Sequence, residues 1–265
     1  MSKEIKDVVK EKYSQIVELD KSCGCGCGND FGFSDGSENF SKDYSKLEGY
    51  EKDADYALGC GIPTAFVSVK EGDTVVDLGS GAGNDVFVAR RMVGESGKVI
   101  GIDMTEAMIE KANKNNKKLG YENVEFRLGD IENMPVKDNT ADVVISNCVM
   151  NLVPDKEKGF AEVYRILNHS GKFSISDIVI SGDLPEKLKQ SAEMYVGCVA
   201  GAIDIQEYIN TITGVGFQNV KIVEKKKYVL PDELVKQFLS EDDFKLYKAS
   251  NAEILSITVY GERND

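Results

Sequence analysis

The chain of 265 residues has no tryptophan, a single histidine and only five prolines, and it contains no long apolar run. Because a membrane-spanning helix needs about 18 or more apolar residues in succession, we expect no membrane partner. The one histidine, His169, stands in the sequence Asn-His-Ser-Gly, a composition typical of an exposed turn. We therefore expect no general-base catalysis by histidine.

Positive charge is also scarce, because 32 lysines and arginines face 45 acidic residues, which gives a net charge of −13. Nucleic-acid binding depends on clustered basic side chains, so we expect no nucleic-acid partner. The basic run Lys225–Lys227 is typical of a solvated strand edge. The first twenty residues are charged and have helical periodicity, unlike a secretory signal, so we expect a cytoplasmic protein. The length of 265 residues indicates one principal domain.

A glycine-rich motif follows an apolar run, and residues 74–83 read T-V-V-D-L-G-S-G-A-G. A second apolar run, residues 99–102, ends in Asp103, twenty residues after Gly83. Glycines allow a tight turn and a close approach of the backbone to a ligand, and an acid at the end of the second strand can accept hydrogen bonds from ribose hydroxyls. Asn84 stands where a dinucleotide-binding motif needs its third glycine. The pattern predicts a nucleotide-binding βαβ unit for a ligand that is not a dinucleotide.

The spacing D-x-G-x-G-x-G at Asp77, Gly79, Gly81 and Gly83 resembles motif I of the class I S-adenosylmethionine methyltransferases. The resemblance implies S-adenosyl-L-methionine as the cofactor. Another ligand of a Rossmann-like fold is the alternative. A glycine turn without a ligand is disfavoured, because Asp103 falls where a ribose would lie.

Short apolar runs alternate with segments of helical periodicity, which predicts an α/β fold of the Rossmann-like class I methyltransferase type. We expect a mostly parallel sheet of seven strands with helices on both faces and a late antiparallel hairpin. The expected strands are Thr74–Leu78, Lys98–Asp103, Val124–Gly129, Asp142–Ser146, Lys172–Ile180, one near Val220–Val223, and Ile254–Tyr260. The expected helices are Lys3–Leu19, Asp85–Val93, Glu106–Leu119, Asp155–Leu167, those between a capping box at Asp183–Glu186 and about Thr213, and one starting at Pro231.

The same pattern divides the chain into three parts. Residues 1–60 hold a helix and a Cys/Gly-rich loop that we expect to close the acceptor site. Residues 61–182 form the cofactor-binding core, and residues 183–265 form a helical cap over the acceptor pocket together with the C-terminal strands.

Ligands in such sheets bind over the carboxyl ends of the strands, which selects further residues. Met104 follows the second expected strand, where packing on the adenine face and ordinary core filling are equally expected. Asp130 and Ile131 follow the third strand, where they can meet the adenine edge, and Asn147 ends the fourth. The predicted cofactor-binding set is Asp77, Gly79, Ser80, Gly81, Gly83, Asp103, Met104, Asp130, Ile131 and Asn147.

The chain has six cysteines, at positions 23, 25, 27, 60, 148 and 198. We expect them to be reduced in an intracellular protein, and the C-x2-C pairs of a zinc site are absent. A single buried cysteine is usually a small hydrophobic residue. However, Cys60 precedes the core, Cys148 ends the fourth strand, and Cys198 follows the fifth. All three are expected at one pocket, and thiolates select soft, thiophilic ions.

Several stretches resemble the arsenite methyltransferases over roughly residues 50–202. They are residues 58–63, 76–85, 146–156, 175–179 and 197–202, of which N-C-V-x-N-L-x-P-D-K at 147–156 is the most specific. The resemblance implies that Cys60, Cys148 and Cys198 bind arsenic(III) and are the catalytic residues in arsenic detoxification. It also implies Asp103 as the ribose acid and Asn147 as a cofactor-pocket residue. The arsenic lone pair would attack the sulfonium methyl group without a general base, and glutathione or thioredoxin would restore the trivalent state.

The chain departs from the family in three places. It has no cysteine after Cys198, although larger members have further cysteines in a longer C-terminal extension. His169 stands where a Pro-Gly-Gly-like turn is usual. The N-terminal cysteine or cysteine pair of the family is replaced by C-G-C-G-C-G. For Cys23, Cys25 and Cys27 we expect arsenite capture and delivery or disulfide exchange, and the alternative is a tail with incidental thiols.

Two other functions fit the residues less well. One is a small-molecule methyltransferase of the quinone or sterol type, in which the cysteines are structural. The other is a non-catalytic thiolate protein that sequesters metalloids, with C-G-C-G-C-G as the sink.

Overall fold

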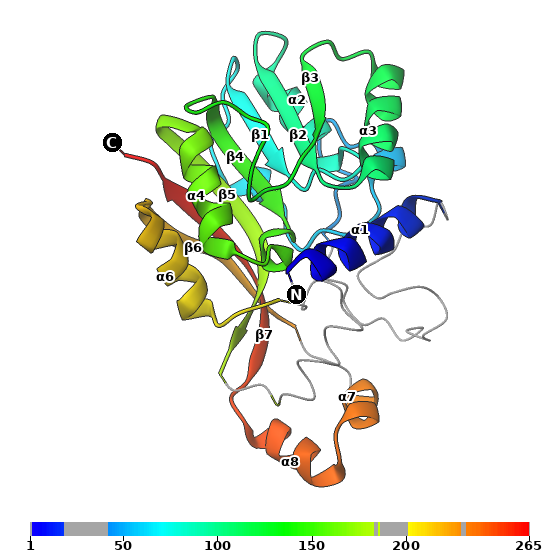
Figure 1. The fold of residues 1–265 in the computed structure, drawn as a ribbon, viewed down its shortest axis with the longest axis vertical. Coiled ribbons are helices and arrows are strands. Elements are labelled where there is room, and N and C mark those ends of the chain that lie inside the picture. Colours follow the sequence, from blue (N-terminus) through cyan, green and yellow to red (C-terminus); the bar gives the residue numbers. More distant parts are fainter. Residues whose placement is uncertain (1, 19–41, 183–184, 186–200, 229–231, 265) are drawn as a thin grey trace.

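The computed structural model describes residues 2–18, 42–182, 185, 201–228 and 232–264. Its strands form one seven-stranded sheet in the order β3-β2-β1-β4-β5-β7-β6 (Figure 1). The first five strands along the chain are parallel, and β7 is antiparallel to both β5 and β6. The strands are β1 Thr74–Leu78, β2 Lys98–Asp103, β3 Val124–Leu128, β4 Ala141–Asn147, β5 Leu167–Ser181, β6 Gln218–Tyr228 and β7 Glu253–Glu262.

Helices cover both faces of the sheet, with α2 and α3 on one face and α4 and α6 on the other. The α-helices are α1 Ser2–Glu18, α2 Asn84–Val93, α3 Glu106–Leu119, α4 Lys156–Ile166, α6 Ile205–Val215, α7 Asp232–Phe238 and α8 Glu241–Ala249. Short 3-10 helices are η1 Lys52–Ala54, η2 Pro63–Phe66 and η3 Met150–Leu152. The expected layered α/β architecture with its late antiparallel hairpin is confirmed.

The apolar runs of the strands are explained by burial on both faces. Along β1, Val75 belongs to the core under α2 and α3, whereas Val76 and Leu78 belong to the core under α4 and α6. Successive side chains of a strand point to opposite faces, so a strand covered on both sides needs an uninterrupted apolar sequence.

Most predicted boundaries agree with the structure to within one or two residues, and three regions differ. Strand β5 begins at Leu167, so His169 lies in a strand rather than a turn, although its side chain is exposed as expected. The reason is that Leu167 pairs with Ala141 and the Ser170 N–H donates to the Arg263 carbonyl. Strand β6 is longer than expected, and the segment after position 231 forms both α7 and α8. The capping box at 183–186 lies mostly outside the described residues.

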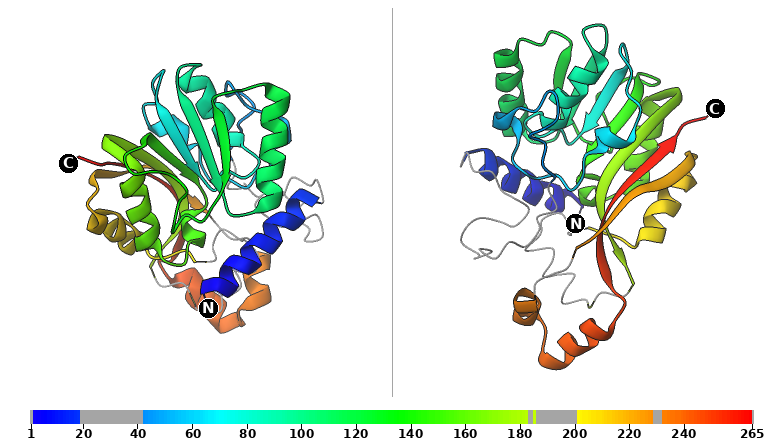
Figure 2. Two further views of the ribbon diagram at one scale, coloured as in Figure 1. Left: turned by 45° about the horizontal axis from the view of Figure 1, so that its top comes forward. Right: turned by 180° about the vertical axis from the view of Figure 1, so that it is seen from behind.

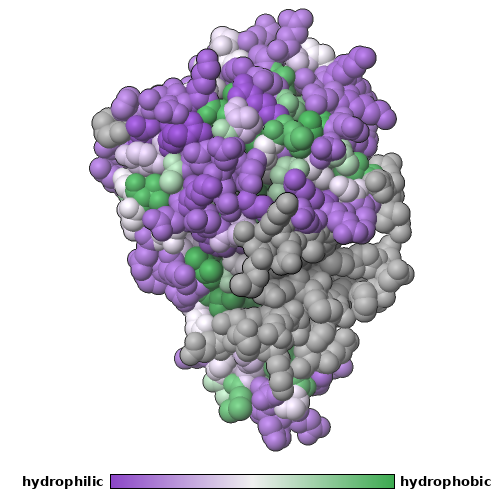
Figure 3. All heavy atoms as spheres, in the orientation of Figure 1, coloured by the Kyte–Doolittle hydropathy of each residue, from purple (hydrophilic) through white to green (hydrophobic). Residues whose placement is uncertain are grey.

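Helix α1 packs against α3 and runs past the ends of the central strands (Figure 2). Hydrophilic residues predominate on the described part of the face in Figure 3, as the strong acidic balance predicts. Among the described helices, none is both long enough and apolar enough to cross a membrane.

Candidate active site

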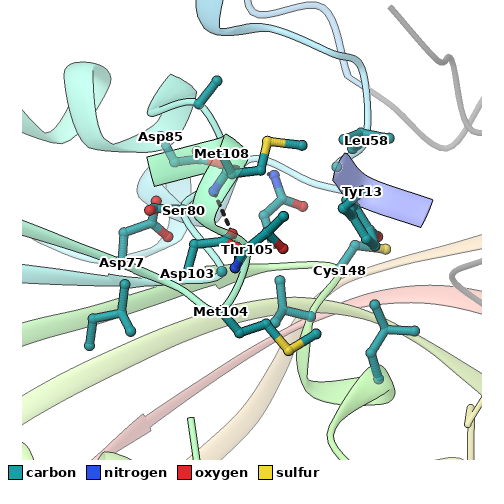
Figure 4. Close-up of a pocket in the computed structure, with 18 of the residues that line it drawn as sticks. Tyr13, Leu58, Asp77, Ser80, Asp85, Asp103, Met104, Thr105, Met108 and Cys148 are labelled. Carbon is teal, nitrogen blue, oxygen red and sulfur yellow. Dashed lines mark hydrogen bonds between the residues drawn. The ribbon is translucent and has the colours of Figure 1, made fainter. Parts of the chain in front are cut away.

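A pocket opens at the carboxyl ends of β1, β2 and β4, next to α1 (Figure 4). Its empty space, counting the open mouth, is about 1170 Å³. Nine of the ten predicted cofactor residues line it, and these are Asp77, Gly79, Ser80, Gly81, Asp103, Met104, Asp130, Ile131 and Asn147.

Gly83, the tenth predicted residue, is not among the residues that line the pocket. It precedes α2 with φ 103°, a conformation that favours glycine. A Cβ there would lie 2.8 Å from the Phe87 ring and 2.9 Å from the Phe126 ring. Gly83 therefore allows the tight turn into α2 and its close packing on the two rings.

The carboxylate of Asp103 lies at the end of β2, where the sequence predicts a ribose acceptor. It accepts hydrogen bonds from the backbone N–H groups of Gly81 (3.0 Å) and Thr105 (2.8 Å). Burial raises the pKa of Asp103, and these amides act in the opposite direction. The amides hold the carboxylate in a fixed orientation at the pocket wall.

Two further carboxylates, Asp77 and Asp85, lie in the same pocket and are buried. Burial raises the pKa of Asp77 well above its usual value, and the negative charges of Asp85 and Asp103 add to the increase. Burial also raises the pKa of Asp85 from 3.8 to about 6, although hydrogen bonds from Asn147 and Tyr44 lower it. Such a concentration of acids suits a cationic ligand.

Asp85 was expected only as the start of a helix. The signal in the sequence is a carboxylate two residues after Gly83, in the first turn of the helix that follows the glycine motif.

Two polar atoms of the pocket lining have unmet hydrogen-bonding capacity. Ser80 Oγ and Asn84 Oδ1 are buried, and neither has a hydrogen-bond partner among the described residues. Because buried polar groups are normally paired, these atoms are available to a polar ligand. Together with the acidic wall, they fit a polar, positively charged cofactor.

Helix α1 contributes to the pocket through Lys6, Val9 and Tyr13, which sequence reasoning did not identify. The Lys6 ammonium binds Asp130 at 2.6 Å and Glu132 at 3.0 Å. The helical periodicity does not predict this contact, because it shows that one face of the helix is buried but not which residues pack against that face.

The predicted cysteines Cys60 and Cys148 are both buried, with 0% and 2% of their surface exposed. The Asn147 side chain links them, because its Oδ1 accepts the Cys60 N–H at 2.9 Å and Asn147 immediately precedes Cys148. Both cysteines also lie within electrostatic range of the Tyr208 phenol. The pKa of that phenol is raised well above its usual value, mainly by burial and next by Asp177. Negative charge on Cys60 and Cys148 adds to the increase.

Cys148 adopts φ 63°, the left-handed region that non-glycine residues rarely occupy. Its N–H donates to the Ser176 carbonyl on β5 at 2.7 Å. Conformations of this kind gather at functional sites. Cys148 also lines the cofactor pocket, whereas Cys60 does not.

Cys198, Cys23, Cys25 and Cys27 lie outside the described residues. The structure therefore describes two of the three predicted arsenic ligands, which are linked through Asn147, and the third lies outside its described residues. Within the described ranges, no group of three or more His, Cys, Asp or Glu side chains could hold a metal ion.

The sequence and the fold have counterparts among known proteins. Residues 69–229 match the family described as a methyltransferase domain. The arsenite methyltransferase of Halobacterium salinarum is 42% identical over 232 residues, which are 84% of this chain and 59% of that protein. The human arsenite methyltransferase is 34% identical over 206 residues, 72% of this chain and 54% of that protein.

A solved structure is also similar. The arsenic(III) S-adenosylmethionine methyltransferase from Chlamydomonas reinhardtii aligns with a TM-score of 0.64 at 32% identity, over 78% of this chain and 67% of that one. The present chain spans little more than half the length of the haloarchaeal and human proteins.

Proposed function

Because the chain belongs to the arsenite methyltransferase family of class I S-adenosylmethionine methyltransferases, we propose that it methylates trivalent arsenic. The observation that carries the proposal is that Asn147, at the end of β4, bonds to the backbone of buried Cys60 and directly precedes buried Cys148, which lines the cofactor pocket. The substrate is arsenite or a methylated arsenical, and the biological role is arsenic detoxification in the cytoplasm.

S-adenosylmethionine, when bound, supplies an electrophilic methyl group on a sulfonium. The Asp103 carboxylate, already oriented by two backbone amides, accepts hydrogen bonds from the ribose hydroxyls. Ser80 Oγ and Asn84 Oδ1, which have no hydrogen-bond partner among the described residues, are available to it. The buried acids Asp77 and Asp85 balance its positive charge when they are ionised. The part of the pocket assigned to adenine is lined by Asp130, Ile131 and Met104.

The acceptor site consists of the thiolates of Cys60, Cys148 and Cys198. Sulfur ligands suit a soft, thiophilic centre such as arsenic(III). Cys148 belongs both to the cofactor pocket and to the cysteine pair, so its thiolate holds the substrate next to the methyl donor. Arsenic bound to three sulfurs keeps a lone pair, so the protein needs no base to activate it, and its contribution is proximity and orientation.

The cycle also needs a reductant, since methylation of arsenic(III) through its lone pair leaves a pentavalent product. Small thiols such as glutathione, or thioredoxin, return the product to the trivalent state. Cys23, Cys25 and Cys27 are assigned to capture of arsenite or to this thiol exchange.

The test is to incubate the purified chain with arsenite, S-adenosylmethionine and glutathione, and to separate the arsenic species by chromatography. Methylated arsenicals and stoichiometric S-adenosylhomocysteine are expected only when all three reactants are present. Replacing glutathione by thioredoxin and its reductase identifies the preferred reductant.

Two results would favour the other functions. Arsenite binding without any S-adenosylhomocysteine would indicate a sequestering protein. Production of S-adenosylhomocysteine with a quinol or sterol acceptor, but not with arsenite, would indicate a small-molecule methyltransferase.

A further inference from the structure

The backbone of Cys60 and Gly61 bonds to side chains from distant parts of the chain. The Cys60 N–H and the Gly61 N–H donate to Asn147 Oδ1 at 2.9 and 3.2 Å. The Cys60 carbonyl accepts from Ser256 Oγ at 2.8 Å. The Gly61 carbonyl accepts from the Tyr44 hydroxyl at 2.9 Å and from Asn147 Nδ2 at 3.0 Å. All of the backbone polar groups of this dipeptide therefore have side-chain partners.

These partners are polar groups at buried positions, where an apolar side chain would avoid the free-energy cost of desolvation. Ser256 is 5% exposed and lies in β7, the antiparallel strand between β5 and β6. On the neighbouring strand, Ser176 Oγ contacts Thr258 Oγ1 at 2.9 Å, and a Cβ on Gly61 would lie 2.3 Å from Ser176 Oγ. A buried loop leaves its N–H and carbonyl groups without water, so these hydrogen bonds replace the lost solvent.

The set of contacts continues into the cofactor pocket through Asp85. Its Oδ1 lies 2.8 Å from the Tyr44 hydroxyl, whose single proton serves either Asp85 or the Gly61 carbonyl, and its Oδ2 accepts from Asn147 Nδ2 at 3.1 Å. Asp85 itself lines the pocket. The donors that hold the Cys60 backbone are thus oriented by a carboxylate of the cofactor site.

We propose that Asn147, Tyr44 and Ser256 are positioning residues that fix the Cys60 backbone, so that its thiol is preorganised beside Cys148 for a trivalent thiophilic substrate. The proposal rests on the arsenic function proposed above and adds the residues that prepare its first ligand. Fixing the loop before binding removes the cost of ordering it during binding. Ser256 is the informative member, because it is 196 residues from Cys60 and does not line the cofactor pocket.

The test compares Ser256→Ala with Ser256→Thr, which keeps the hydroxyl donor, and with Ser174→Ala as a matched control. Ser174 is a fully buried serine on β5 whose Oγ has no hydrogen-bond partner among the described residues. Folding of each variant is checked by thermal melting, and cofactor-site integrity by calorimetric binding of S-adenosylhomocysteine.

The first measurement is the rate at which iodoacetamide alkylates Cys60, followed by peptide mass spectrometry. Loss of one buried hydrogen bond should increase that rate about five- to tenfold in Ser256→Ala. Ser256→Thr and Ser174→Ala should stay close to the wild-type rate. This readout does not depend on any reaction with arsenic.

The second measurement is arsenite binding, followed through the ultraviolet absorbance of arsenic–thiolate bonds. Ser256→Ala should bind arsenite about five- to tenfold more weakly, with unchanged S-adenosylhomocysteine affinity and recovery in Ser256→Thr. A higher KM for arsenite with a smaller change in kcat is the expected kinetic pattern.

The outcomes separate the two proposals. If the wild-type chain does not methylate arsenite but the alkylation pattern holds, the proposed function fails and the positioning of Cys60 stands. If the wild type methylates arsenite while Ser256→Ala alters neither the Cys60 alkylation rate nor arsenite affinity, the positioning role is overturned. Equal effects of Ser256→Ala and Ser174→Ala would also overturn it, because they would reflect general loosening of the sheet.

Discussion

The ammonium of Lys6 in α1 contacts the carboxylate of Asp130, after β3, at 2.6 Å. The N-terminal helix is therefore tied to the loop that the sequence assigned to the adenine edge. Asp130 lines the pocket but already has a cationic partner. The neighbouring Ile131 also lines the pocket and adds an apolar side chain to its wall.

Lys6→Ala should loosen α1 from the pocket mouth without unfolding the protein. The pair is partly exposed, so the free energy of unfolding should fall by no more than about 1 kcal/mol. Dissociation of S-adenosylhomocysteine, measured by stopped-flow displacement, should become a few-fold faster, and high salt should shrink the difference. Lys10→Ala, an exposed lysine on the same helix, is the control. Equal dissociation rates in the two variants would rule out a role for the Lys6 contact.

Asp103→Ala should weaken cofactor binding by at least about tenfold, since two ribose hydroxyls lose a charged acceptor worth about 1.5–3 kcal/mol. Calorimetry with S-adenosylhomocysteine measures the change. Arsenite binding should be nearly intact, and Glu110→Ala, an exposed acid on α3, should bind the cofactor like the wild type. An unchanged affinity in Asp103→Ala would remove Asp103 from the ribose site.

Cys60→Ser, Cys148→Ser and Cys198→Ser should each fold, bind the cofactor and lose methylation of arsenite. A monomethylated arsenical has one fewer position for sulfur, so two thiolates suffice to hold it. Cys60→Ser should therefore retain methylation of monomethylarsenite while losing that of arsenite. Speciation of the products from each substrate distinguishes the two steps.

The matched control for this series changes Cys23, Cys25 and Cys27 together to serine. It should raise the arsenite concentration for half-maximal rate, or the dependence on added thiol, and leave the maximal rate within a few-fold. Full activity in any of the three single variants would exclude that cysteine as a ligand. An inactive triple variant at saturating arsenite and thiol would place one of its cysteines in the active site.

Gly61→Ala should displace the Cys60 loop, because the new Cβ would lie 2.3 Å from Ser176 Oγ and 2.6 Å from Ser176 Cβ. Overpacking of this kind costs about 1–3 kcal/mol of unfolding free energy. Arsenite affinity should fall more than cofactor affinity. In Gly214→Ala the new Cβ, on α6, meets no atom within 4 Å, so this control should gain up to about 1 kcal/mol from helix propensity. Chemical denaturation of both variants measures these changes, and a stable Gly61→Ala with normal arsenite affinity would contradict the expectation.

The cofactor-free protein should lose stability as pH rises through the range in which Asp85 ionises. Its pKa is raised by burial from 3.8 to about 6, so the folded state binds more protons than the unfolded state between these values. The free energy of unfolding therefore decreases as pH increases across this window. The pKa values of Asp77 and Asp103, also raised by burial, act in the same direction.

Denaturant titrations at about pH 5 and about pH 7 measure the effect, above the range where exposed carboxylates titrate. Asp85→Asn should have a shallower pH dependence, because the amide cannot ionise. S-adenosylmethionine, which carries positive charge, should stabilise the protein more at the higher pH. An Asp85→Asn profile parallel to the wild type would show that Asp85 does not control this window.

Local patterns in the sequence were sufficient for the order of elements and for the cofactor motif. The predicted bounds of β1, β2 and α3 coincide with those of the structure, because each element is a short apolar run or an amphipathic repeat bounded by glycine. Asp103 was identified because strand ends and ligand sites coincide in parallel sheets. Local patterns do not predict where β5 begins, because its start depends on pairing with β4 and on a hydrogen bond to the C-terminal segment.

The sequence by itself determined the layered fold, the acid that ends β2, and the cysteines that follow or precede strands. Only the tertiary structure decided how Cys60 is held, because its partners come from distant segments, and Ser256 is 196 residues from it. A serine in an apolar strand and a tyrosine in a polar loop carry no periodic signal. Their partners depend on where each chain segment passes in space, and hydrogen bonds over a few ångströms are fixed only once the whole sheet has formed.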